Sequence, residues 1–199
     1  MISNKDRSGF FGASDVPFIV GNWITKTWHK WWLTKIGIDR NNVETVSMNV
    51  GTHKEHQILD IISPFIEKDK QILIERLRLR VNLDGNVAKH IYEVKTRKEE
   101  QGWKVPKKYI EQVNVQMYAF DTYDADLVVY ELTEKDYKNY FLPIDMARLN
   151  YYPVKRDDAW LESVFLPRIK HLADCLEKGV YPDVNKFKKE KKDAKRQVN

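Results

Sequence analysis

The spacing of hydrophobic residues in the first third of the chain predicts helices. Ser14, an N-cap residue type, opens the first, and Gly21 ends it. In the second, three tryptophans recur at helical spacing. A capping-box pattern at Thr52–Glu55 opens the third. The expected helices cover residues 14–21, residues 27–36 and a segment that begins at residue 52.

The pattern changes after residue 70, where hydrophobic and polar residues alternate as in half-buried strands. Asp84-Gly85-Asn86 has the composition of a turn, so we expect a hairpin around it. The following segments predict, in order, a strand at 91–95, a helix at 106–120, a strand at 125–132, a further strand near 140–144, and a long helix at 158–178 that Pro167 bends. This order predicts an α/β (α+β) fold with a central mixed β-sheet flanked by helices.

Length and composition limit the function classes. The 199 residues suffice for one domain, which we expect over residues 1–185, followed by a lysine-rich, flexible tail over 186–199. A single cysteine excludes a disulfide framework, and no apolar run predicts a membrane span or a signal sequence. We therefore expect a cytoplasmic protein without a membrane partner. The net charge of +5 is compatible with a polyanionic partner.

Three residues of the predicted hairpin form the main candidate for chemistry. Glu93 and Lys95 lie two apart on a strand and so share a face, and the hairpin brings Asp84 beside them. Two carboxylates about 4 Å apart repel by about 4 kcal/mol at an effective dielectric near 20. A divalent cation offsets this repulsion, and oxygen-only ligands favour Mg²⁺ or Mn²⁺. The alternative is structural: an ordinary turn followed by an exposed strand with an ion pair.

The spacing of Asp84, Glu93 and Lys95 matches the D…(D/E)xK signature of the PD-(D/E)XK nucleases. Further motifs in the same order make the chain resemble the lambda exonuclease, or YqaJ-like, family of viral recombinase exonucleases. The resemblance runs from about Arg7 to Pro182 and implies a PD-(D/E)XK, restriction-endonuclease-like core. The segments that carry it are Arg7, Ser14–Asp15, Gly51–Glu55, Asp84–Gly85, Glu93–Thr96 and Tyr109–Met117.

The resemblance implies a role for each matching position. Asp84, Glu93 and the main-chain carbonyl of Val94 would hold the metal, expected as two Mg²⁺ ions with Mn²⁺ as a substitute. Lys95 would position or activate the attacking water, and Gln112 would orient the nucleophile or the phosphate. Glu55 would complete the metal cluster, although the capping box alone could explain it.

The resemblance also implies contacts with nucleic acid. Arg7 and Ser14 match the pair that binds a terminal 5′-phosphate. The pattern departs from the family at Asn114, where a second glutamine is expected, and Gln116 is the helical neighbour of Gln112. Further candidate DNA contacts are Gln116, Arg97, Lys98, Lys107 and Lys108. The tryptophans Trp28, Trp31 and Trp32 are expected to pack in the core rather than to stack on DNA.

The leading hypothesis is a Mg²⁺-dependent 5′→3′ exonuclease that resects double-stranded DNA ends for recombination by single-strand annealing. The resemblance implies a phage or prophage origin, a single-strand annealing protein as partner and a homotrimeric ring. The alternatives are an endonuclease of the same superfamily, or a catalytically silent DNA-binding or phage interaction protein with this fold.

Overall fold

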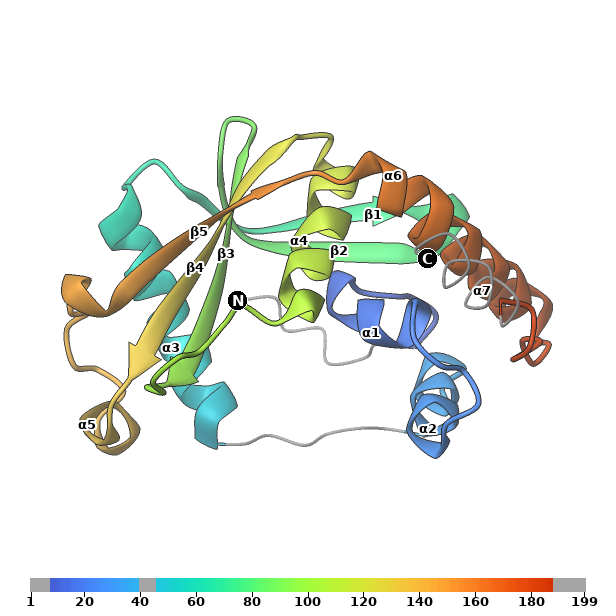
Figure 1. The fold of residues 1–199 in the computed structure, drawn as a ribbon, viewed down its shortest axis with the longest axis horizontal. Helices are drawn as coiled ribbons and strands as arrows, with labels where there is room; N and C mark the ends of the chain where they lie inside the picture. The colour runs from blue at the N-terminus through green and yellow to red at the C-terminus, as the bar shows by residue number, and fades with distance from the viewer. Residues whose placement is uncertain (1–7, 40–45, 188–199) are drawn as a thin grey trace, which may run out of the picture.

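The computed structural model describes residues 8–39 and 46–187. Five strands form one mixed sheet in the order β1-β2-β3-β4-β5, in which only β3 and β4 are parallel. This arrangement confirms the expected mixed sheet flanked by helices (Figure 1). The strands are β1 (Glu67–Ile74), β2 (Leu79–Val87), β3 (His90–Lys98), β4 (Asp124–Leu132) and β5 (Leu149–Lys155).

Helices cover both faces of the sheet. α3 packs on one face against Val94, Val128 and Tyr130, and α4 lies on the opposite face (Figure 1). α4 joins the parallel strands β3 and β4, a connection that requires a long crossover. The helices are α1 (Val16–Ile19), α2 (Lys26–Lys35), α3 (Val46–Ile62), α4 (Lys107–Phe120), α5 (Glu134–Lys138), α6 (Asp158–Trp160) and α7 (Leu166–Lys178). Among the described residues, no helix combines the length and apolarity that crossing a membrane requires.

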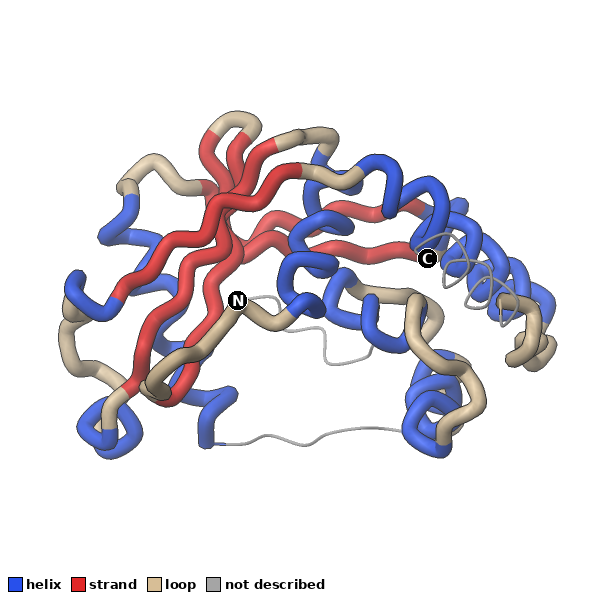
Figure 2. The backbone as a smooth tube through the Cα atoms, in the orientation of Figure 1, coloured by secondary structure: helices blue, strands red, loops and turns tan. Residues whose placement is uncertain are grey.

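The sheet divides at the middle of β2. Pairing between β2 and β3 covers only three positions, from Val87↔His90 to Gly85↔Tyr92. Beyond Gly85, β2 continues along β1 and no longer pairs with β3, whereas β3 continues along β4 (Figure 2). The N-terminal segment occupies part of the edge that β3 leaves, because Phe11 forms a parallel bridge with Leu79. This division opens the sheet where the candidate carboxylates lie.

The predicted turn at Asp84-Gly85-Asn86 is wrong, since these residues lie inside β2 and the turn falls at Ala88–Lys89. Ala88 adopts a left-handed conformation, with φ of 48°. Gly85 serves packing rather than turning. A Cβ at Gly85 would lie 2.6 Å from the Ile66 side chain and 2.8 Å from the Leu59 side chain. Because Gly85 has no side chain, α3 and the residue that precedes β1 can pack closely against β2.

Two predicted helix starts are also wrong. The first helical segment is a 3₁₀ turn at Ala13–Asp15, with Gly12 as its N-cap, which continues into α1. The third helix begins at Val46, so Thr52 lies within it and caps nothing. Val50 is fully buried, and Gly51 lies close enough to β3 that a Cβ would be 3.0 Å from the Thr96 hydroxyl. Tertiary packing therefore overrides the weak helix propensity of Gly51.

Nearer the C-terminus, the expected strand near 140–144 is wrong, whereas the expected long helix over 158–178 is confirmed. The segment 140–144 is a loop, and the fifth strand is Leu149–Lys155. Side chains hold this loop, since Lys54 donates to the Leu142 carbonyl and the Asp145 N–H donates to the Tyr130 hydroxyl. The long helix contains a π-helical segment, Leu161–Phe165, immediately before α7, and Pro167 lies in the first turn of α7. Proline lacks an N–H, which favours such an irregularity.

Candidate active site

Asp84 marks the point at which β2 and β3 separate. The register of the hairpin would place it opposite Glu93, but the ladder has ended there. Instead, the Asp84 side chain accepts a hydrogen bond of 2.8 Å from the Val94 N–H. The N–H and C=O of one residue in a strand leave on the same side. The Val94 carbonyl therefore also faces the gap between β2 and β3, on the side of Asp84.

Glu93 is 1% exposed and accepts hydrogen bonds from three side chains. Lys95 and Gln112 donate to its Oε1, and Gln116 donates to its Oε2. The two glutamines lie one turn apart on α4, so both amides face the same carboxylate. Gln116 is itself 1% exposed, so it is too buried for the expected contact with DNA. Its amide instead holds the Glu93 carboxylate in orientation.

The electrostatics of the site reflect buried like charges. Burial and the neighbouring Glu93 carboxylate raise the pKa of Asp84 well above its usual value. Burial and Glu93 likewise raise the pKa of Glu55. Burial favours the neutral amine of Lys95, but the carboxylates of Glu93 and Asp84 raise its pKa above the ordinary value. Lys95 therefore carries a positive charge at neutral pH.

Asp69 is an acidic residue at the site that sequence reasoning missed. Its neighbours Lys68 and Lys70 pair with Gly85 and Leu83, so Asp69 lies opposite Asp84 across β1 and β2. Asp69 has a φ of 57°, unusual for a residue other than glycine. No motif marks this position, and only the register of the two strands could have indicated it.

Glu55 and Asp69 approach one another on the α3 side. His56 Nε2 lies 3.1 Å from Asp69 Oδ2, and Glu55, His56 and Asp69 offer ligand atoms within 4.8 Å of one another. Because Thr52 caps nothing, the structural explanation for Glu55 as part of a capping box no longer applies.

The donor set fits a hard divalent cation. Asp84, Glu93 and Glu55 supply carboxylate oxygens, the charge of Glu93 contributes to the raised pKa of both Asp84 and Glu55, and the Val94 carbonyl faces the same gap. Carboxylates that lie close together with little exposure to water raise the free energy of the folded state unless a positive charge lies beside them. Lys95 supplies one such charge, and oxygen ligands of this kind suit Mg²⁺ or Mn²⁺.

A cleft of about 260 Å³ extends from the carboxylates to the N-terminal segment. Ser14 is exposed in the 3₁₀ turn and lines this cleft. Asp15 is 7% exposed at the wall of the cleft, where its carboxylate accepts from the Trp31 indole at 2.9 Å and from Lys35 at 2.6 Å. The cleft is lined by Phe10, Phe11, Gly12, Ala13, Ser14, Asp15, Lys35, Gln71, Arg80, Asn82, Asp84, Glu93, Lys95 and Gln112. Arg7 lies outside the described residues.

The remaining candidate DNA contacts differ in their surroundings. Arg97 pairs with Glu131 and stacks on Trp103, which indicates a structural role. Three exposed lysines remain available at the surface: Lys98, paired with Glu134; Lys107, paired with Glu111; and Lys108.

The aromatic helix packs in the core, as expected. Trp28, Trp31 and Trp32 are at most 7% exposed, and they pack with Phe11 in the larger of the two hydrophobic clusters. They are therefore not a stacking surface for DNA. Asn114, the departure from the family pattern, accepts from the Asp157 N–H at 2.6 Å and holds the segment that enters α6.

Comparisons with solved structures identify the same fold in exonucleases. An alkaline exonuclease from Laribacter hongkongensis superposes with a TM-score of 0.65 at 18% identity, covering 94% of this chain and 96% of its own. A phage-related exonuclease from Haemophilus somnus gives a TM-score of 0.58 at 14% identity, covering 85% of this chain and 92% of its own. The chain thus has the fold that its motif resemblance to viral recombinase exonucleases implied. No family model and no curated protein matches the sequence.

Proposed function

We propose that the protein is a metal-dependent deoxyribonuclease that degrades double-stranded DNA from its ends in the 5′→3′ direction. The observation that carries the proposal is the convergence of Asp84, Glu93, Lys95 and Gln112, from two strands and a helix, in one cleft. A protein that only binds DNA gains nothing from clustered carboxylates beside phosphates. The printed descriptions of the structural neighbours as exonucleases support the same reaction class.

Each residue of the candidate site would have a separate role in the reaction. Asp84, Glu93, the Val94 carbonyl and Glu55 would hold Mg²⁺. When bound, the ion supplies Lewis-acid charge to the phosphate and lowers the pKa of an attacking water. The Lys95 ammonium would place positive charge beside the phosphate as negative charge develops there. Gln112 and Gln116 hold the Glu93 carboxylate in orientation, and Gln112, which lines the cleft, can also contact the phosphate.

The biological setting belongs to the same proposal. It rests on the resemblance to viral recombinase exonucleases and includes a cytoplasmic location, a phage or prophage origin, a single-strand annealing protein as partner and a homotrimeric ring. Exonuclease action is favoured over internal cleavage because Ser14, which matches a 5′-phosphate ligand of that family, lines the same cleft as the carboxylates.

The test is digestion of linear, 5′-phosphorylated duplex DNA in Mg²⁺ or EDTA, with a covalently closed circle in parallel. Lys95→Ala should abolish cleavage, whereas Lys178→Ala, the same change at an exposed helical lysine that pairs with Asp174, should leave it intact. Loss of only the linear DNA supports the exonuclease. Cleavage of the circle supports an endonuclease, and no metal-dependent cleavage of either substrate contradicts the proposal.

A further inference from the structure

Tyr109 lies in the first turn of α4, one turn before Gln112, so the two side chains share a face of the helix. Gln112 donates to Glu93 Oε1, the same oxygen that accepts from Lys95. The Lys95 ammonium lies 5.7 Å from the centre of the Tyr109 ring. One face of α4 therefore supplies an amide to the carboxylate and an aromatic ring to the lysine.

Packing holds the Tyr109 ring in this position. The Tyr109 N–H donates to the Pro106 carbonyl at 2.9 Å where α4 begins. The ring is partly buried and packs against the larger hydrophobic cluster. Val113 and Met117, both fully buried, anchor α4 in the same cluster. The ring therefore has little freedom to move away from Lys95.

The contact between Tyr109 and Lys95 is a cation–π interaction. An ammonium within about 6 Å of an aromatic ring centre is attracted by the negative potential of the ring face. The attraction strengthens where water is excluded, and only 25% of the Lys95 side chain is exposed. Lys108, at the surface, lies 5.1 Å from the same ring centre. The Tyr109 ring therefore attracts one ammonium in the cleft and one at the surface.

The Tyr109 ring and the Glu93 carboxylate attract Lys95 in different ways. In the proposed function Glu93 is a metal ligand, and a carboxylate that holds a divalent cation has less negative potential to offer a neighbouring ammonium. An aromatic face is not a ligand for a hard cation, which takes oxygen atoms. The attraction between the ring and Lys95 therefore persists when the metal binds.

We propose that Tyr109 is a positioning residue, whose ring keeps the Lys95 ammonium beside the phosphate while Glu93 holds the metal. This assignment rests on the proposed nuclease function. Tyr109 acts through Lys95, and the attraction comes from the ring rather than from the hydroxyl group. Phenylalanine at this position should therefore serve the same role, whereas leucine, which is apolar but has no aromatic face, should not.

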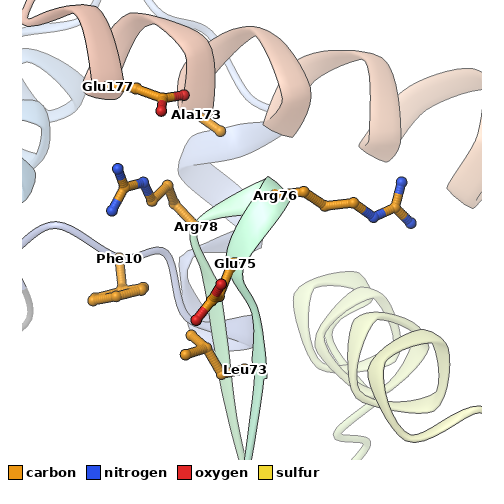
Figure 3. Close-up of a pocket in the computed structure, with 7 residues that line it drawn as sticks. All are labelled: Phe10, Leu73, Glu75, Arg76, Arg78, Ala173 and Glu177. Atoms are coloured by element: carbon orange, nitrogen blue, oxygen red, sulfur yellow. The ribbon is translucent and has the colours of Figure 1, made fainter.

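Tyr118 provides a matched control on the same helix. It is also partly buried against the larger hydrophobic cluster, and its hydroxyl accepts from the Arg76 guanidinium at 3.2 Å. Arg76 belongs to a second cavity, of about 460 Å³, from which its side chain extends away from Glu75 and Arg78 (Figure 3). Tyr118→Leu thus removes a half-buried tyrosine with a cationic neighbour from α4 without affecting Lys95.

An NMR measurement tests the contact without any cleavage. Protons that lie over an aromatic ring resonate upfield, and lysine labelled with ¹³C at the ε position makes the Lys95 methylene signal visible, with Lys95→Arg to assign it. The signal should lie upfield in the wild type with and without Mg²⁺, and should remain so in Tyr109→Phe and Tyr118→Leu. Tyr109→Leu should move it to the position of an ordinary lysine. The same signal in the wild type and in Tyr109→Leu would overturn the assignment.

Steady-state cleavage of duplex DNA then tests the role of the contact. Tyr109→Leu should lower kcat by about 2- to 30-fold, the range for a cation–π interaction, and should leave KM nearly unchanged. Tyr109→Phe should retain most of the rate, and Tyr118→Leu should match the wild type. Cleavage by the wild type with an unchanged kcat in folded Tyr109→Leu overturns the assignment and leaves the nuclease proposal intact. A wild type that shows the upfield signal but cleaves no DNA contradicts the nuclease proposal instead, and leaves the contact between Tyr109 and Lys95 supported.

Discussion

The Asp84 carboxylate accepts a hydrogen bond from the main-chain N–H of Val94 at the position where the two strands stop pairing. A side chain thus replaces the backbone partner that β2 would have supplied. Where the strands separate, the Val94 carbonyl faces the gap between them, and the buried Glu93 carboxylate lines the same cleft as Asp84. The candidate site is therefore a consequence of an interrupted ladder.

Gln116 offers a test of how Glu93 is oriented. Gln116→Leu removes the donor to Glu93 Oε2 without changing a residue that lines the cleft. We expect activity to fall about 10- to 100-fold, as for other residues that orient metal ligands. Initial rates at saturating Mg²⁺ measure the effect, with Gln101→Leu, an exposed loop position, as control. Unchanged rates would contradict the orienting role.

Asp84→Asn tests the buried charge in the absence of metal. The raised pKa of Asp84 means that its ionised form opposes folding, so the metal-free variant should melt at a higher temperature than wild type at pH 8. The difference should shrink as pH falls, because wild-type Asp84 then becomes protonated. Asp60→Asn, at an exposed position, should show neither effect.

The same pair of variants tests metal binding without a catalytic assay. Mg²⁺ should raise the melting temperature of the wild type and of Asp60→Asn, since a ligand that binds only the native state stabilises it. The shift should be lost in Asp84→Asn. An equal shift in all three proteins would show that Asp84 is not a metal ligand.

Gly85→Ala tests the contact between α3 and the divided sheet. The added methyl group would meet Leu59 and Ile66 at distances that force a rearrangement, at a cost of about 1–3 kcal/mol. Urea unfolding measures the loss. Gly12→Ala is the control, because a Cβ there has no neighbour closer than 3.6 Å. Equal stability of the two variants would contradict this close packing.

The lowered pKa of Asp136 predicts how the free energy of unfolding changes at low pH. Burial alone would raise its pKa, but hydrogen bonds from Arg148 and Thr133 lower it from 3.8 to about 2. The ionised Asp136 carboxylate therefore stabilises the folded state fully above its ordinary pKa of 3.8, and this stabilisation is lost as pH falls through about 2. It amounts to about 2 kcal/mol.

Asp136→Asn should therefore be less stable than wild type at pH 7 and should lose less stability between pH 4 and pH 2. Denaturant unfolding at several pH values measures both effects. Asp60→Asn again serves as control, since its side chain is 64% exposed. A parallel decline of wild type and Asp136→Asn in acid would contradict the assignment.

The corrections to the sequence-based elements have one physical origin. Asp84-Gly85-Asn86 has turn composition, yet Gly85 is needed because Leu59 and Ile66 fill the space of a side chain. Thr52 and Glu55 match a local capping pattern, yet the helix extends back to Val46 because Val50 packs in the core. Local patterns record what a segment allows, whereas neighbours distant in sequence select among the allowed conformations.

The sequence by itself indicated the mixed sheet and the amphipathic helices through their periodicity, and it indicated the candidate set Asp84, Glu93, Lys95 and Gln112 through its motif resemblance to a known family, because periodicity and motif spacing are local properties. Only the tertiary structure decided which other groups join them. Asp69 reaches the site through the β1–β2 register, and Arg80 lines the cleft from the same strand as Asp84. Both positions depend on how strands pair and separate in space, which follows from long-range packing that no local pattern encodes.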